Sequence, residues 1–178
     1  MKPVGKMTQA ELGAYVQSHL MSEGIDVVLS GGAAVAFYTS GEYVSNDIDL
    51  VNQYSVRRRQ IQSAMEELGF LPEGRHFVHL DSEFFVEFPP GPLGFGDQPA
   101  TRVDEIRLGT GILRVISPTD CVKDRLAWYF HYGDTQCLAQ AGMVSRGHPI
   151  DVRDVEKWSE AEGKLDEFKA IRTRLTKS

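Results

Sequence analysis

The chain has 178 residues, of which 42% are hydrophobic and 25% are charged, and its formal net charge is −6. These values predict a compact soluble domain and exclude an intrinsically disordered chain. The negative charge argues against non-specific binding to nucleic acid or to an anionic membrane. We find no apolar run of the ~18 residues that cross a bilayer and no secretory signal, so we expect a cytoplasmic protein without a membrane partner.

The two cysteines, Cys121 and Cys137, lie sixteen residues apart in apolar, helix-like sequence. A cytoplasmic location predicts that both are reduced and buried. A zinc site would need further ligands nearby, and none cluster there.

The first part of the chain alternates helical and strand patterns. Thr8 and Glu11 have the spacing of a capping box, which predicts the start of an amphipathic helix that ends at Gly24. The patterns that follow predict a strand at 26–29, a short helix at 33–38, a strand at 46–51 and a helix at 55–68.

The second part changes from strand to helix near Ser117. Two hairpins are predicted before it, pairing 77–80 with 84–88 and 103–108 with 112–116, with an irregular Pro/Gly-rich loop at 89–94. Ser117 and Pro118 suit the N-cap and first position of a helix that reaches about Tyr132. Three more helices are predicted at 134–144, 151–160 and 164–175. The fold class is therefore α/β (α+β), with a mixed sheet and helices in 1–116 and a helical region in 117–178.

A glycine pair marks the first candidate site. Gly31 and Gly32 lie where a predicted strand turns into a helix. Glycines allow close backbone approach to a ligand, and the amides at a helix N-terminus attract phosphate. The alternative for a lone Gly-Gly pair is a tight turn without a ligand.

Two acidic positions mark the second and third candidates. Asp47 and Asp49 alternate with Ile48 along a predicted strand, so both carboxylates lie on one face, an arrangement suited to a hard cation such as Mg²⁺. Glu87 lies in the apolar strand Phe84–Phe88, on the face opposite its hydrophobic side chains. The alternatives are a solvated edge strand for the aspartates and a solvated side chain for Glu87.

The order of these features resembles the nucleotidyltransferase superfamily of the DNA polymerase β type. Leu29-Ser30-Gly31-Gly32 followed by Asp47-Ile48-Asp49-Leu50 is similar to the signature of small bacterial members, including stand-alone enzymes and abortive-infection toxins. Ser117-Pro118-Thr119-Asp120 is similar to the way these chains enter their C-terminal helices. The resemblance covers residues 25–160.

The resemblance implies a nucleotidyltransferase-like mixed sheet and a set of site residues. It implies that Asp47 and Asp49 hold Mg²⁺, with Mn²⁺ as an alternative, and that Glu87 is the third metal ligand and catalytic carboxylate. Three carboxylates suit a two-metal phosphoryl-transfer site. It also implies that the phosphates of a nucleoside triphosphate, with ATP expected, bind at Ser30, Gly31 and Gly32.

Two features depart from the family pattern. Fourteen residues separate Gly32 from Asp47, which predicts a longer loop between the two motifs. The third acid is glutamate where aspartate is commoner, and Asp81 and Glu83 are close enough in sequence to replace it.

Other residues have two interpretations. Lys123 can contact triphosphate oxygens, or it can form an ion pair with Asp120 or Asp124. The basic run Arg57–Arg59 can contact a polyanion such as tRNA, or it is a solvated helix face. The aromatic residues at helical spacing are interpreted as core in preference to a base-stacking platform: Trp128, Tyr129, Phe130 and Tyr132.

The function expected is Mg²⁺-dependent transfer of a nucleoside monophosphate to a hydroxyl acceptor, with release of pyrophosphate. The alternative is a catalytically degenerate domain that binds a nucleotide or a partner protein. The acceptor is left open among tRNA, a protein hydroxyl and a small antibiotic, because a fold does not fix a substrate. The resemblance to toxins also implies an antitoxin-like protein as a partner.

Overall fold

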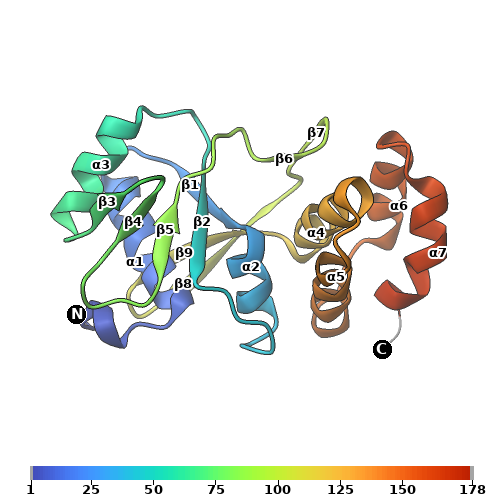
Figure 1. Cartoon of the computed structure of the whole chain (residues 1–178), viewed down its shortest axis with the longest axis horizontal. Helices are drawn as coiled ribbons and strands as arrows, with labels where there is room; N and C mark the ends of the chain where they lie inside the picture. The colour runs from blue at the N-terminus through green and yellow to red at the C-terminus, as the bar shows by residue number, and fades with distance from the viewer. Residues whose placement is uncertain (1, 177–178) are drawn as a thin grey trace.

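A computed structural model describes residues 2–176 as a mixed sheet with helices packed on it and a helical region at one end (Figure 1). The helical elements are the 3-10 turn η1 (Val4–Lys6), α1 (Gln9–Ser22), α2 (Gly31–Tyr38), α3 (Arg58–Glu67), α4 (Pro118–Tyr132), α5 (Thr135–Gly147), α6 (Val152–Ala161) and α7 (Leu165–Thr176). The strands are β1 (Val27–Ser30), β2 (Asp47–Asn52), β3 (Leu71–Glu73), β4 (His76–Val78), β5 (Phe85–Glu87), β6 (Gly94–Phe95), β7 (Gln98–Pro99), β8 (Val103–Leu108) and β9 (Gly111–Ile116).

Seven strands form the main sheet in the order β3-β4-β5-β2-β1-β9-β8. The β1–β2 pair is antiparallel, whereas β2–β5 and β1–β9 are parallel. The remaining neighbours are antiparallel hairpin pairs. β1 and β2 are therefore interior strands. The β1–α2 turn consequently lies at the end of a strand in the middle of the sheet.

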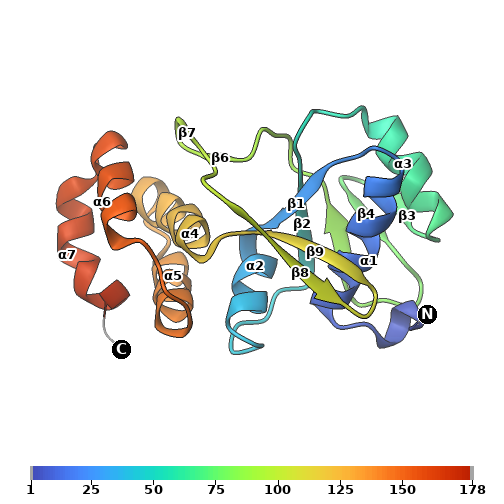
Figure 2. The same ribbon diagram turned by 180° about the vertical axis from the view of Figure 1, so that it is seen from behind.

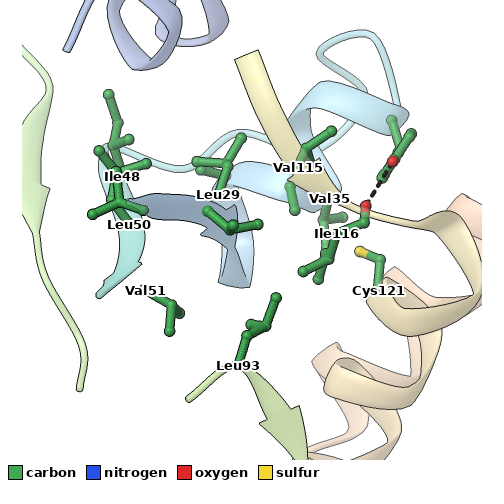
Figure 3. Close-up of a cluster of buried hydrophobic side chains, with 14 of the residues drawn as sticks. Leu29, Val35, Ile48, Leu50, Val51, Leu93, Val115, Ile116 and Cys121 are labelled. Atoms are coloured by element: carbon green, nitrogen blue, oxygen red, sulfur yellow. Dashed lines mark hydrogen bonds between the residues drawn. The ribbon is translucent and has the colours of Figure 1, made fainter. Parts of the chain in front are cut away.

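The core lies between the sheet and its helices. α1 contacts β9 and β1, whereas α2 contacts β2 and β1 and also reaches α4 and α5. Figure 3 shows side chains of β1, β2, β9, α2 and α4 meeting in this core, among them Leu29, Ile48, Val115 and Cys121. Because α2 is made of small and apolar residues, it packs closely on the sheet and holds the start of its own first turn in a fixed position.

The helical region begins directly after β9, so α4 leads away from the end of the sheet (Figure 2). Ser117 caps α4 by accepting a hydrogen bond from the amide of Asp120 at 3.1 Å. Trp158 of α6 is fully buried, and its indole donates to the carbonyl of Phe95 at 3.0 Å, which ties the short β6–β7 hairpin to the helices. No helix within residues 2–176 has the length and apolar character needed to cross a bilayer.

Most predicted elements are present, including the α1 capping box between Thr8 and Glu11 and the turn between β8 and β9. Cys121 and Cys137 are both buried and free, as expected. Two predictions were incomplete. The segment at 89–94 was predicted as loop, but Gly94 starts the β6–β7 hairpin. The edge strand β3 was not predicted, because its three residues are all exposed and show no alternation of burial.

Candidate active site

A pocket of about 550 Å³ opens between the middle of the sheet and α4. It is lined from the sheet side and from the helical region, by residues far apart in the sequence. The lining includes Ser30, Gly31, Gly32, Tyr43, Asp47, Asp49, Arg75, Glu87, Asp124, Arg125 and Trp128. The predicted acidic residues and glycines therefore share one pocket.

β2 and its neighbours position the acidic side chains. Ile48 is fully buried, so Asp47 and Asp49 lie on the opposite face of the strand. In register, Asp49 pairs with Ser30 across the antiparallel β1–β2 contact and with Glu87 across the parallel β2–β5 contact. Asp49 is thus flanked within the sheet by the residue that precedes the glycine pair and by the third acid.

The glycine turn touches the acidic strand. Gly31 has a φ of +64°, a conformation that side chains rarely adopt. A Cβ built at Gly31 would lie 2.3 Å from the Oδ2 of Asp49, so only glycine permits this close approach. The side chain of Ser30 makes no capping hydrogen bond to α2. The first-turn amides of α2 therefore have no side-chain cap beside the carboxylates, which is an arrangement suited to a phosphate held together with a cation.

Asp49 is the most perturbed carboxyl group of the pocket. Burial raises the pKa of Asp49 to about 7, and the charges of Asp47 and Glu87 act in the same direction. Asp47 accepts a hydrogen bond from the hydroxyl of Ser45, and the amide of Gln9 donates to the backbone carbonyl of Asp47 at 2.9 Å. The strand start is therefore held firmly while its carboxylates remain under mutual repulsion.

Glu87 has two partners of its own, one in the neighbouring strand β4 and one in the turn before it. Its Oε1 lies 3.3 Å from Nε of Arg75, and its Oε2 lies 3.2 Å from Nε2 of His76. Asp81 and Glu83, the alternative third acids, do not line this pocket and instead border a separate surface hollow near Gly5. Among the sequence candidates for the third acid, the structure brings Glu87 alone to the pocket.

The carboxylate groups of the pocket are of the chemical type that binds divalent cations. Within residues 2–176, no three His, Cys, Asp or Glu side chains stand in the arrangement of a preformed metal site. However, Asp47, Asp49 and Glu87 offer carboxylate oxygens, which hard cations prefer. Burial and the neighbouring carboxylates disfavour the charged form of Asp49, although Arg125 acts in the opposite direction, and a bound cation would stabilise that form.

Arg125 is a pocket residue that the sequence analysis did not single out. Its side chain is largely buried, donates to Oδ2 of Asp124 from Nη2 at 2.6 Å, and approaches Gln140 at 3.4 Å. Burial alone would lower the pKa of the Arg125 guanidinium, but the charge and hydrogen bonds of Asp124 raise it overall. A guanidinium group that stays positively charged therefore lies in the pocket. The helical phase of α4 is the sequence signal that could have identified Arg125, because it places Arg125 on a different side of the helix from Lys123.

Lys123 does not reach this pocket. Its ammonium group is buried, 2.6 Å from Asp154 and 3.7 Å from Asp120. Lys123 therefore forms an ion pair, as the second interpretation predicted, but the pair is buried. The prediction that Lys123 contacts the nucleotide is corrected, because its side chain joins α4 to α6. The run Arg57–Arg59 is exposed, and Arg58 donates to the carbonyl of Gly74 at 2.6 Å.

The aromatic residues of α4 divide into two groups. Phe130 is buried and stacks on Trp158 with ring centroids 5.9 Å apart. Trp128 and Tyr132 are 49% and 75% exposed. The prediction that all four aromatic residues are core was therefore wrong for these two, since they lie on the face of α4 that turns away from α6.

Comparison with solved structures identifies the class of fold, and the chain has the nucleotidyltransferase fold. The antibiotic-resistance factor ANT(2'')-Ia in solution matches with a TM-score of 0.53 at 14% identity, covering 90% of this chain and 91% of that chain. A crystal structure of ANT(2'')-Ia with adenylyl-2''-tobramycin matches with a TM-score of 0.50 at 17% identity, covering 94% and 99%.

An antigenic nucleotidyltransferase-like protein from Paracoccidioides brasiliensis matches with a TM-score of 0.59 at 14% identity, covering 96% of this chain and 94% of that chain. No family model and no curated protein matches the sequence. The predicted resemblance to the nucleotidyltransferase superfamily is thus confirmed at the level of the fold.

Proposed function

We propose that this protein transfers a nucleoside monophosphate from a nucleoside triphosphate to a hydroxyl group and releases pyrophosphate. The observation that carries the proposal is the meeting of the glycine turn with Asp49, which is itself in register with Glu87. The nucleotidyltransferase fold supports it, because one solved structure of similar fold is ANT(2'')-Ia in complex with adenylyl-2''-tobramycin. ATP is the proposed donor.

The chain's own residues suggest how the reaction is arranged. The amides at the start of α2, with Ser30, Gly31 and Gly32, bind phosphate oxygens, and Arg125 contacts the phosphates from the opposite wall of the pocket. The acceptor oxygen forms a bond to the α-phosphorus as the bond from that phosphorus to pyrophosphate breaks. The proton of the acceptor hydroxyl passes to a carboxylate, for which Glu87 is the proposed base.

Asp47 and Asp49 are the proposed Mg²⁺ ligands, with Glu87 as the third. When bound, the cation stabilises the charge that develops on the transferring phosphoryl group. Asp49 places a carboxyl group against the glycine turn, where a bound cation would stabilise its charged form against burial and the charges of Asp47 and Glu87.

The test is incubation with ATP labelled at the α-phosphate, with and without Mg²⁺, in the presence of tRNA, protein or an aminoglycoside. We expect label on one acceptor class and release of pyrophosphate, both dependent on the metal. The Asp47→Asn variant serves as the matched inactive control. Failure of every acceptor class to take label, with no pyrophosphate released, would overturn the proposed transfer.

A nucleotide-binding domain without catalysis is the second candidate, and one observation favours it. Glu87 is already paired with Arg75 and His76, so its carboxylate is shared with groups that compete with a metal or an acceptor proton. A rise in unfolding temperature with Mg²⁺ and ATP, without any labelled product, would support this candidate over the enzyme.

A further inference from the structure

Trp128 and Tyr132 form an exposed aromatic pair on α4. Their ring centroids lie 5.0 Å apart, with an angle of 35° between the ring planes. Among the described residues after Pro118, they are the only large hydrophobic side chains that are exposed. An indole ring that is half in water forgoes part of the free energy of burial, so the pair offers an apolar surface that a ligand could cover.

The pair is continuous with the candidate active site. Trp128 lines the pocket together with Arg125, and the β6–β7 hairpin contributes Gly94 and Phe95 to the same wall. Arg125, Trp128 and Tyr132 fall at helical positions i, i+3 and i+7, so they share one face of α4. Along the helix axis, Trp128 lies about 4.5 Å and Tyr132 about 10 Å beyond Arg125.

We propose that the Trp128–Tyr132 pair is a stacking platform for the nucleobase of the bound nucleotide. This inference rests on the proposed function, since it places the phosphates at Arg125 and the glycine turn and the base further along the same helix face. Stacking on aromatic rings tolerates every base, because each base has a π-face. The platform therefore predicts substantial binding energy from the base but little preference among bases.

The position of the pair favours a small planar ligand over a protein partner. A docking surface for a protein needs a contiguous apolar patch of several hundred Å², whereas this face of α4 offers two rings beside a charged pocket. The charged residues of α4 that line the pocket with Trp128 are Asp124 and Arg125, and Arg125 is the one suited to phosphate. A ligand that joins phosphate to a flat ring matches both features.

The two tryptophans of the chain make a direct optical test possible. Trp158 is fully buried and hydrogen-bonded to Phe95, whereas Trp128 is half exposed in the pocket. Titration with Mg²⁺ and ATP should quench the fluorescence of Trp128 in a saturable way. Mg²⁺ with inorganic tripolyphosphate, which has no base, should bind without that quenching. The Trp128→Phe variant retains only Trp158 and should lose the signal while still binding ATP.

Affinities measured by calorimetry give an independent readout. Trp128→Leu should raise the Kd for ATP by roughly 5- to 100-fold, the range expected for loss of one stacked base. It should leave the Kd for tripolyphosphate within about twofold, and Trp128→Phe should keep most of the ATP affinity. Tyr54→Leu is the matched control, because Tyr54 is 77% exposed and does not line the pocket.

Different failures point to different hypotheses. If ATP binds to Trp128→Leu as tightly as to the wild type, the platform is wrong, and a change confined to the KM of an acceptor would assign the rings to the acceptor instead. If neither ATP nor tripolyphosphate binds the wild-type protein, the proposed function fails before the platform is tested. Circular dichroism and unfolding temperatures confirm that each variant is folded, which is expected for an exposed helix position.

Discussion

Asp49 and Glu87 are register partners in the parallel β2–β5 pair, although they come from strands separated by a helix and a hairpin. On its other side Asp49 is paired with Ser30, and its carboxylate packs against Gly31. The Ser30–Gly31 turn and β5, two segments far apart in the sequence, thus flank one residue of β2. This convergence distinguishes the pocket from an ordinary acidic strand end and supports the predictions below.

Asparagine at Asp47 or Asp49 should abolish nucleotidyl transfer. Each substitution keeps the side-chain volume but removes a charged ligand, so we expect activity to fall at least about 100-fold. Thermal shifts with ATP should lose their dependence on Mg²⁺. Labelled-nucleotide transfer and the unfolding temperature with and without Mg²⁺ are the measurements. Activity within threefold of wild type in both variants would rule out the aspartate pair as the catalytic centre.

The Asp49→Asn variant should also be more stable than the wild type in the absence of metal. The pKa of Asp49 is about 7 in the folded chain, above its ordinary value of 3.8. The folded state therefore binds more protons between these values, so the wild type loses stability as pH rises from about 4 to about 7. We expect the variant to unfold at least about 2–4 °C higher at pH 8, the shift that about 1 kcal/mol gives in a domain of this size.

The advantage of Asp49→Asn should shrink toward pH 4.5, where the wild-type carboxyl is protonated. Melting curves in a chelator across this pH range check the sign. Asp97→Asn changes an exposed carboxyl at the β6–β7 turn and serves as the control. If the stability advantage of Asp49→Asn does not vary with pH, the charge of Asp49 is not its cause.

Local signals in the sequence predicted most elements, because caps and hydrophobic periodicity act within a few residues. Thr8 and Glu11 cap α1, and Ser117 caps α4, as their sequence positions indicate. The alternation of polar and apolar residues in β2 and β5 is compatible with the pairing of these strands, but it does not predict that pairing. A parallel contact between distant strands depends on the packing of the whole sheet.

The helix phase of α4 explains the errors at the site. Lys123 and Arg125 lie only two positions apart, so they point to different sides of α4. Sequence alone did not show which side faces the sheet pocket and which faces α6. Consequently Lys123 was predicted to face the pocket, which Arg125 lines instead, and Trp128 and Tyr132 were assigned to the core.

Alanine at Gly31 should damage both stability and activity. The residue has a positive φ, and a Cβ would overlap the carboxylate of Asp49. Gly24→Ala is a matched control, because Gly24 has a φ of +73° and open space around its Cβ position. Both variants should lose about 1–2 kcal/mol of stability from the backbone strain alone.

Only Gly31→Ala should displace Asp49, so its transfer activity should fall at least about 100-fold while that of Gly24→Ala stays within about twofold. Denaturant unfolding and single-turnover transfer separate the two effects. Equal activity in the two variants would show that contact between the glycine turn and Asp49 is not needed for the reaction.

Substitutions at Lys123 and Arg125 should both lower stability, because each removes one partner of a buried ion pair, but only the substitution at Arg125 should weaken nucleotide binding. Lys123→Met leaves the fully buried Asp120 without its cation, and loss of one partner of a buried pair costs roughly 3–5 kcal/mol. Adding Asp120→Asn should recover part of that loss. Below its unfolding temperature, Lys123→Met should bind ATP with a Kd within about twofold of the wild-type value.

Arg125→Gln should instead raise the Kd for ATP about tenfold or more, because the guanidinium group in the pocket is lost. Calorimetric titration of folded samples decides the matter: weaker ATP binding in Lys123→Met than in Arg125→Gln would return Lys123 to the nucleotide site.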